Sequence, residues 1–387
     1  MTILFVTNYY NHHQSAVSRA FASLEGVEYR LIETQYMEPW RRSIGWSDDQ
    51  KSEFVVRCDD FQKDPQQYRA MIDEADVVIY GSAPAHLFKT RLKAGKLTFA
   101  YSERIYKRKY EPYKFPIRFV RFWKNFGRYK SLYMLCASAF TAADFAKTFT
   151  FLNKTYKWGY FPEFYEYDDV EKRIDAKRKN SMIWVARMLP WKHPEAVIEV
   201  ARRLKQDGFD FELTMVGGGE LKKQVESRVV QLGLEDCVKL AGVLTPEQVR
   251  EQMEQSEIYL FTSDRNEGWG AVLNESMNSG CAVVASHAIG SVPFLVRDGE
   301  NGLIYQDGDV EALYRKVRWL IEHPRERKQM AKHAYETLAR EWNAEQAVKR
   351  FIAMVEQIIS GNKRPDLFRD GPCSKARIIR DDWYQET

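Results

Sequence analysis

Two carboxylates flank a short glycine-rich turn in the segment DRNEGWGAVLNESMNSG (264–280). Glu267 comes just before Gly268–Gly270, and Glu275 lies in a helical pattern that begins at Ala271. Because about two helical turns separate the two acids, they cannot easily share one metal ion. They are better placed to accept hydrogen bonds from two sets of hydroxyls, one on each side of a phosphate bound by backbone N–H groups of the turn. A sugar, a diphosphate and a ribose in a row present that order of groups.

Two cations precede this segment in WVARMLPWKHPEA (184–196). Arg187 ends a predicted strand, and Lys192 lies in the loop before a predicted helix that opens with Pro194. Arginine offers a planar fork of donors and lysine a mobile point charge, which together suit a diphosphate whose charge grows as a bond breaks. Either cation alone is more simply a solvated one among the 58 Lys and Arg residues of the chain. With the acidic pair they favour a binding site.

Strand and helix patterns alternate along the chain and decide where these side chains lie. Buried strands are predicted in the first half from apolar, often β-branched runs: TILFVT (2–7), VEYRLIE (27–33), ADVVIY (75–80), KLTFA (96–100) and YMLCA (133–137). In the second half, strands and amphipathic helices alternate more regularly. This order predicts the α/β class, with two doubly wound, Rossmann-like parallel-sheet domains facing each other across a cleft. Ligands of such folds bind at the loops after the strands.

The predicted domain boundary lies in the charged stretch YFPEFYEYDDVEKRIDAKRKN (160–180), where periodicity lapses. We therefore expect an N-terminal domain over 1–165 and a C-terminal domain over 175–345. A last helix and a polar tail over 346–387 should pack back toward the N-terminal domain.

Composition excludes several other classes of protein. A chain of 387 residues fits two domains of ordinary size, and its net charge of +4 does not by itself imply nucleic acid. The five cysteines are scattered without a C-x-x-C pair, which indicates a reducing compartment and no zinc site or disulfide frame. No basic, apolar leader opens the chain, and no run reaches the ~18 apolar residues of a spanning helix. We expect a cytoplasmic protein that meets a membrane, if at all, peripherally at its inner face.

The second half resembles the retaining GT-B glycosyltransferases, specifically the large family four that uses nucleotide diphosphate sugars. The resemblance rests on Arg187 with Lys192, on VGGGE (216–220), on EGWGAVLNE (267–275) with its Glu-seven-residues-Glu spacing, and on DGENGLIY (298–305). The first half matches mainly in its rhythm of strands and helices.

The resemblance implies a donor site in the C-terminal domain and an acceptor site in the N-terminal domain. The implied donor contacts are Arg187 and Lys192 on the diphosphate, Glu267 with the backbone of Gly268, Trp269 and Gly270 on the transferred sugar and phosphate, Glu275 on the ribose, and the loops of Gly217 and Val243 beside the base. Glu267 is expected to position the donor sugar rather than to attack it.

The resemblance also implies the reaction. A hexose would move from a UDP- or GDP-linked donor to a saccharide or lipid-linked glycan with retention of configuration, in cell-surface polysaccharide or lipopolysaccharide biosynthesis. No metal and no other cofactor is implied, because the cations and the helix end do the work of a metal.

Three residues of the first strand's exit loop, Asn11, His12 and His13, and Glu103 after a later strand should face the cleft. A histidine there could neutralise the diphosphate or contact the donor sugar, and Glu103 could orient the acceptor hydroxyl. An ordinary loop or surface role explains these residues equally well.

A basic, aromatic stretch runs from Arg104 to Lys130. Its alternation of cations with Phe, Trp and Tyr suits an anionic membrane surface, which we rank first. A core helix with a solvated basic face ranks second. Single-stranded nucleic acid ranks third and is not expected.

Two other functions use much of the same residue set. A non-catalytic sensor or scaffold would keep the nucleotide-sugar pocket without the acceptor site. A nucleotide-sugar epimerase fits the donor motif less well than a transferase does.

Overall fold

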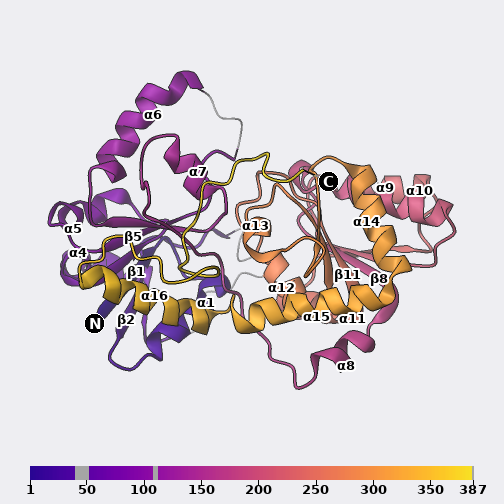
Figure 1. The fold of residues 1–387 in the computed structure, drawn as a ribbon, viewed down its shortest axis with the longest axis horizontal. Coiled ribbons are helices and arrows are strands. Elements are labelled where there is room, and N and C mark those ends of the chain that lie inside the picture. The colour runs from indigo at the N-terminus through magenta and orange to yellow at the C-terminus, as the bar shows by residue number, and fades with distance from the viewer. Residues whose placement is uncertain (40–51, 108–111, 386–387) are drawn as a thin grey trace. The chain divides into compact units, whose positions relative to one another are not determined.

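The computed structural model of the protein describes residues 1–39, 52–107 and 112–385 (Figure 1). The chain divides into two compact units. Unit 1 comprises Met1–Glu163 and Glu341–Arg380, and unit 2 comprises Phe164–Arg340 and Asp381–Thr387.

Unit 1 is built on a seven-stranded sheet with the order β3-β2-β1-β4-β5-β6-β7, in which every neighbouring pair is parallel. Its strands are β1 (Thr2–Thr7), β2 (Glu28–Glu33), β3 (Val55–Val56), β4 (Val77–Tyr80), β5 (Thr98–Ser102), β6 (Leu132–Cys136) and β7 (Thr155–Lys157). The central strands are almost wholly buried, which is why they are nearly continuous apolar runs.

Helices surround the sheet of unit 1 (Figure 1). They are α1 (His12–Ala22), α3 (Cys58–Lys63), α4 (Pro65–Glu74), α5 (Lys89–Lys93), α6 (Phe115–Phe122), α7 (Thr141–Ala146) and α16 (Ala344–Ile359). Although α16 is far along the chain, it lies beside α1. Its Phe351 ring centroid is 5.4 Å from that of Phe21 in α1 and 4.9 Å from that of Phe99 in β5. This aromatic cluster makes α16 part of the core of unit 1.

Unit 2 contains a six-stranded parallel sheet with the order β10-β9-β8-β11-β12-β13. Its strands are β8 (Arg178–Val185), β9 (Glu212–Val216), β10 (Val238–Gly242), β11 (Ser256–Phe261), β12 (Ala282–Ser286) and β13 (Leu303–Tyr305). Its helices are α8 (Val170–Asp175), α9 (Pro194–Gln206), α10 (Lys222–Gln231), α11 (Pro246–Gln255), α12 (Val272–Asn278), α13 (Val292–Leu295), α14 (Val310–Glu322) and α15 (Pro324–Arg340). Two parallel, doubly wound sheets confirm the predicted fold class.

The segment that the sequence marks only as a boundary contains a helix, α8. The Asp169 side chain accepts a hydrogen bond from the Lys172 N–H at 2.9 Å and caps the start of this helix. Unit 2 accordingly begins at Phe164, earlier than the predicted 175.

The C-terminal tail contacts both units in turn. Lys375 bridges Tyr156 at the edge of the unit 1 sheet, and the Lys157 N–H donates to the Ser374 carbonyl at 2.8 Å. From Asp381 onward the tail belongs to unit 2, which differs from the predicted packing of the whole 346–387 segment toward the N-terminal domain. This end of the tail belongs to unit 2 because Asp381 forms an ion pair with Arg265 of unit 2 at 3.1 Å.

Among the helices that the structure describes, none combines the length and the apolar composition that crossing a bilayer requires.

Candidate functional site

The parallel sheet of unit 2 gathers the predicted donor residues at one edge. Because all six strands run the same way, the loops that follow them lie at the same end of the sheet. Arg187 follows β8, Gly217 follows β9, Val243 follows β10, and Glu267 is in the loop after β11. The sheet order places these four strands next to one another, so the topology alone makes the four loops neighbours.

Lys192 and Glu267 form an ion pair across two of these loops. The Lys192 ammonium contacts the Glu267 carboxylate, and the two side chains are only 11% and 12% exposed. The ammonium also lies 4.3 Å from the centre of the Trp191 ring. The Thr262 hydroxyl donates to the Lys192 carbonyl at 2.6 Å, which joins the loops through the backbone as well. The structure therefore brings a predicted cation and a predicted acid together as one neutral unit.

A tight turn carries Glu267. The Glu267 N–H donates to the Asp264 carbonyl at 3.0 Å, and the Asn266 N–H donates to the Asp264 carboxylate at 2.7 Å. Aspartate at the first position of such a turn, hydrogen-bonded to the backbone two residues on, fixes the turn locally. The carboxylate of Glu267 is thus fixed by its turn and by Lys192.

Gly270 and Trp269 have structural reasons for their identity. Gly270 has φ of 82°, and a Cβ there would lie 2.4 Å from Cζ of Phe261. The Trp269 side chain is fully buried and donates from Nε1 to Asn274 Oδ1 at 2.9 Å. Its ring also packs against Phe294, with the centroids 6.2 Å apart. The indole therefore belongs to the core, and a ligand can meet Trp269 only through its backbone.

Glu275 lies in the first turn of α12, which begins at Val272, one residue later than predicted. Burial raises the pKa of Glu275 to about 7, although the charge of Arg250 opposes the shift. The nearby Tyr259 is wholly buried, and burial followed by the charges of Glu267 and Glu275 raises the pKa of its phenol. The sequence analysis did not identify Tyr259, a residue of β11 whose phenol is affected by the charges of both carboxylates.

The glycine run after β9 packs directly on the loop of Arg187. Gly217 has φ of 133°, and a Cβ at this position would lie 1.9 Å from the Ala186 carbonyl oxygen. The Met188 N–H donates to the Gly218 carbonyl at 2.7 Å. Backbone packs on backbone here, and only glycine permits it. Arg187 itself is exposed, and so is Val243.

In unit 1, the structure corrects the predicted exit loop. His12 and His13 form the first turn of α1, and Asn11 is its N-cap. The Asn11 side chain accepts from the His13 N–H at 3.0 Å, while Gln14 Oε1 accepts from the Asn11 N–H at 3.2 Å. The reason is the capping box Asn-x-x-Gln, which sequence reasoning overlooked. The carboxamide oxygen of Asn11 is therefore used by the helix, and burial lowers the pKa of His12.

Tyr160 connects two predicted residues of unit 1. Its hydroxyl donates to Glu103 Oε1 at 2.7 Å, and its ring stacks on His13 with centroids 5.8 Å apart and planes 10° apart. Lys107 Nζ lies 2.6 Å from the other oxygen of Glu103. His13 and Glu103 thus belong to one cluster. No motif marks Tyr160, which lies in the stretch interpreted as a domain boundary.

The basic, aromatic stretch divides into buried and exposed parts. Arg104 is buried, with Nε 3.7 Å from the buried Asp144 carboxylate, so this cation does not face a surface as predicted. Residues 108–111 of the stretch lie outside the described residues. Farther on, Ile117 is 76% exposed, and Tyr113, Val120 and Trp123 are exposed as well.

A separate loop continues this exposed face. The ring of Phe149, 64% exposed, lies 6.2 Å from the Phe119 ring of α6, and Leu152 nearby in sequence is also exposed. We call Tyr113, Ile117, Val120, Trp123, Phe149 and Leu152 the α6 face. Five cations accompany it in the sequence: Lys114, Arg118, Arg121, Lys124 and Arg128.

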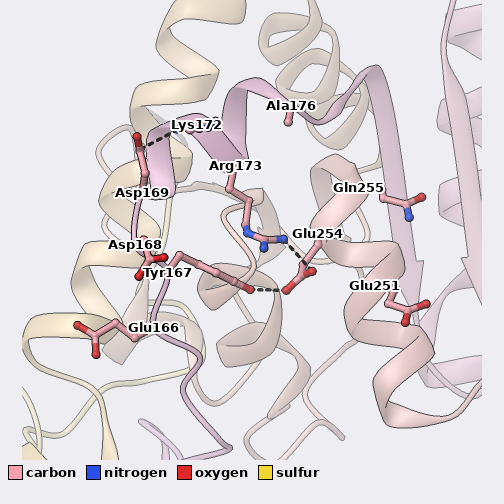
Figure 2. A pocket seen from close by; sticks show the side chains of 10 residues that line it. All are labelled: Glu166, Tyr167, Asp168, Asp169, Lys172, Arg173, Ala176, Glu251, Glu254 and Gln255. Carbon is pink, nitrogen blue, oxygen red and sulfur yellow. Dashed lines mark hydrogen bonds and ion pairs between the residues drawn. The ribbon is translucent and has the colours of Figure 1, made fainter.

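A pocket of about 780 Å³ lies elsewhere in unit 2, between α8 and α11 (Figure 2). One of the acids that line it, Glu254, is held by two internal hydrogen bonds. Glu254 accepts from the Tyr167 hydroxyl at 2.5 Å and from Arg173 at 2.8 Å, as Figure 2 shows. None of the predicted site residues lines this pocket.

Within the described ranges, no three His, Cys, Asp or Glu side chains gather in a way that could hold a metal ion. The acids of the candidate site instead pair with lysine or lie apart on the turn and on α12.

Comparison with known proteins finds matches to the second half of the chain. Residues 168–337 match the family described as Glycosyl transferases group 1. The amylovoran biosynthesis glycosyltransferase AmsK of Erwinia amylovora is 35% identical over 134 residues, which are 33% of this chain and 33% of that protein. The lipopolysaccharide core biosynthesis glycosyltransferase LpsE of Rhizobium meliloti is 27% identical over 143 residues, 37% of this chain and 41% of that protein. The matches thus span less than half of either relative.

The fold has matches along nearly the whole chain. The crystal structure of Anabaena Alr3699/HepE in complex with UDP has a TM-score of 0.67 and 14% identity, and the match covers 92% of this chain and 100% of that one. At this identity the likeness shows the fold alone, which is the GT-B architecture. Residues 168–337 of this chain are thus similar to the glycosyl transferases group 1 family, in agreement with the resemblance of its motifs to the retaining GT-B family four.

Proposed function

We propose that this protein is a retaining glycosyltransferase that moves a hexose from a nucleotide diphosphate donor to a saccharide or lipid-linked glycan acceptor. The observation that carries the proposal is the Lys192–Glu267 pair at the carboxyl edge of the unit 2 sheet, beside a turn that only glycine can form at Gly270. The match of residues 168–337 to the glycosyl transferases group 1 family supports it.

The donor would lie along the loops of unit 2. Lys192 has three N–H donors, so it can keep Glu267 and still reach a phosphate oxygen. Arg187 supplies the second cation for the diphosphate, whose negative charge increases as the sugar leaves. Glu267, fixed by its turn, accepts hydrogen bonds from the transferred sugar.

The nucleoside end would meet Glu275 and the glycine loop. A carboxyl group with a pKa near 7 is partly protonated at neutral pH, so it can both donate to and accept from ribose hydroxyls. The Gly217 loop follows β9, which neighbours β8, and the Val243 loop follows β10, which neighbours β9; both loops would border the base.

The acceptor would lie against unit 1. Glu103 has its oxygens on Tyr160 and Lys107, which orients the carboxylate, and His13 stacks on the same tyrosine. This cluster can accept a hydrogen bond from an attacking hydroxyl. We propose His13 and Glu103 as acceptor-side residues on this basis.

Neither a metal ion nor another cofactor is required in this scheme. The leaving diphosphate is stabilised by Lys192, Arg187 and the backbone of Gly268–Gly270. These groups provide the positive charge that a divalent ion provides elsewhere.

The biological setting follows from the relatives and from the surface of unit 1. AmsK and LpsE are described as biosynthetic enzymes of amylovoran and of lipopolysaccharide core, and HepE was solved with UDP. We propose a UDP- or GDP-linked donor and a role in cell-surface polysaccharide or lipopolysaccharide biosynthesis. The α6 face, apolar and flanked by cations, would hold a cytoplasmic protein at an anionic membrane surface.

Binding and hydrolysis of a panel of UDP-, GDP- and ADP-sugars test the proposal, with Glu267→Ala and Arg187→Ala beside the wild type. Selective binding with turnover that both variants lose supports a transferase and names its donor. Binding without turnover, even with lipid extracts supplied, favours a nucleotide-sugar sensor. An absence of binding contradicts the proposed site.

A further inference from the structure

The last described residues of the chain lie against the loops that follow β11 and β12 and against β13 itself, all in unit 2. Arg265 Nη2 and Asp381 Oδ2 are 3.1 Å apart, and these side chains are 33% and 45% exposed. Arg265 belongs to the turn that carries Glu267. The C-terminal segment 381–385 is therefore tied to the candidate donor site through one side chain.

His287 anchors the same segment on the β12 side. The Asp307 N–H donates to Nδ1 of His287 at 2.9 Å, so Nδ1 is unprotonated and the proton is on Nε2. Nε2 donates in turn to the Asp381 carbonyl at 3.1 Å. The Trp383 indole N–H closes the contact by donating to the His287 carbonyl at 3.1 Å.

Tyr384 anchors the segment on the β13 side. Its hydroxyl donates to the Ile304 carbonyl at 2.6 Å and lies 3.1 Å from Asp298 Oδ2. With His287 and Trp383, this contact fixes the backbone around Asp381. These contacts position the Asp381 carboxylate independently of its ion pair with Arg265.

Because Arg265 and Glu267 belong to the same turn, a contact that restrains Arg265 also restrains Glu267. Arg265 is the second residue of the turn, and the Asp264 carbonyl accepts from the Glu267 N–H at 3.0 Å to close it. A four-residue turn closed in this way moves as one piece. Lys192 holds the Glu267 end and Asp381 holds the opposite side, so two ion pairs set the direction of the Glu267 carboxylate.

We propose that Asp381, acting through Arg265, is a positioning residue for Glu267, and that the C-terminal segment 381–385 is thereby part of the donor site. The catalytic consequence rests on the proposed function, in which Glu267 contacts the donor sugar. The mechanical consequence, a fixed 264–267 turn, does not. An ion pair this exposed contributes little to global stability, so its removal should affect the turn more than the fold.

The test uses the full chain and four variants. Asp381→Asn and Arg265→Gln each remove the pair, and Asp381→Glu keeps its charge. The exchanged double variant, Arg265→Asp with Asp381→Arg, swaps the two charges and so restores an ion pair between the two positions. The matched control is Arg318→Gln in α14, whose pair with Glu322 at 2.9 Å has similar exposure, 46% and 38%.

Two readouts separate the inference from the proposed function. The first is hydrogen–deuterium exchange of peptides covering 264–270 in the ligand-free protein. The second is kcat and donor KM with the nucleotide sugar found in the panel, together with the affinity for the free nucleotide.

We expect faster exchange over 264–270 in Asp381→Asn and Arg265→Gln, and a fall of about fivefold in kcat/KM, the factor that a partly exposed ion pair of about 1 kcal/mol carries. Free-nucleotide affinity should stay unchanged, and Asp381→Glu and the exchanged variant should recover most of both losses. Unchanged exchange in both single variants, or an equal effect of Arg318→Gln, overturns the inference. If the wild type turns over no nucleotide sugar, the proposed function fails and the exchange result alone decides whether the tail fixes the turn.

Discussion

Lys192 and Glu267 contact each other through their charged groups while nearly nine-tenths of each side chain is enclosed. Two residues that would serve opposite parts of a donor, the phosphate and the sugar, are thus joined before a ligand arrives. The pairing lowers the cost of keeping either charge away from water, and it fixes both side chains in direction.

Removing one partner of this pair should be more damaging than removing both. Lys192→Ala leaves a carboxylate enclosed without its cation, and we expect a loss of about 3 kcal/mol in the free energy of unfolding. The double variant Lys192→Ala with Glu267→Ala should be more stable than Lys192→Ala alone. Urea unfolding of Lys192→Ala, Glu267→Ala and the double variant measures this, while turnover should fall at least a hundredfold in each. Additive losses of stability would show that the pair is not coupled.

Glu275 should make stability depend on pH. Burial raises its pKa from the ordinary glutamate value of 4.5 to about 7 in the folded protein, so the folded state binds the proton more tightly than the unfolded chain. The contribution to stability is fully present below about pH 4.5 and is lost as the pH rises through about 7. Glu275→Gln should therefore gain stability relative to the wild type on going from pH 5 to pH 8, by an amount of the order of 3 kcal/mol. Parallel unfolding curves for the two proteins across this range would contradict the shift.

Tyr160→Phe tests the acceptor-side cluster with minimal disturbance. The ring can still stack on His13, but Glu103 loses the hydroxyl that donates to it at 2.7 Å. We expect a rise of about fivefold in the acceptor KM with donor affinity unchanged, since one hydrogen bond contributes about 1 kcal/mol. Steady-state kinetics with the acceptor varied, and nucleotide binding by calorimetry, measure the two effects. A change confined to donor affinity would move these residues to the donor side.

The α6 face should govern attachment to vesicles. Ile117→Glu places a negative charge at the most exposed apolar residue of that face, and we expect at least a tenfold loss of binding to vesicles of anionic lipid. Val230→Glu, at a residue of unit 2 that is 63% exposed, is the matched control and should bind like the wild type. Co-sedimentation with anionic and with neutral vesicles gives the comparison. Equal loss in both variants, or equal binding to both kinds of lipid, would count against a membrane role for this face.

Chelation should leave transfer intact. The candidate site pairs its acids with cations and shows no metal-binding group among the residues described. Activity in the presence of EDTA should equal activity with added Mg²⁺ or Mn²⁺ once the donor is known. Loss of all turnover in the chelator would show that a divalent ion is part of the reaction.

Most of the fold could be predicted from residue patterns within single helices and strands. The predicted range 2–7 of β1 has the observed bounds, because its apolar run defines it locally. Helices α14 and α16 are also defined locally, by apolar periodicity and by the capping residues Asp309 and Asn343. The short edge strands β3 and β7 and the helix α8 were not predicted. Two or three residues at a sheet edge carry too little periodicity to be recognised.

The candidate site was predictable only where its motif is local. Glu267, Gly270 and Glu275 lie within nine residues of sequence, and the strand-turn-helix order places them. The partners Tyr160 of Glu103 and Asp381 of Arg265 come from distant segments, and only the tertiary fold brings them together. Arg104 is the opposite case. It belongs to a basic stretch that was predicted to face a surface, but its ion pair with Asp144 keeps it buried.

The membership of α16 in unit 1 has a consequence for synthesis on the ribosome. When the first 163 residues have emerged, Phe21 and Phe99 still lack Phe351, which is translated only after the Phe164–Arg340 part of unit 2. The apolar surface that α16 covers therefore remains without α16, either exposed or shielded by other means, while about 180 further residues are translated. Unit 2 can complete its main sheet and helices in that interval, so the second half of the chain is able to mature before the first.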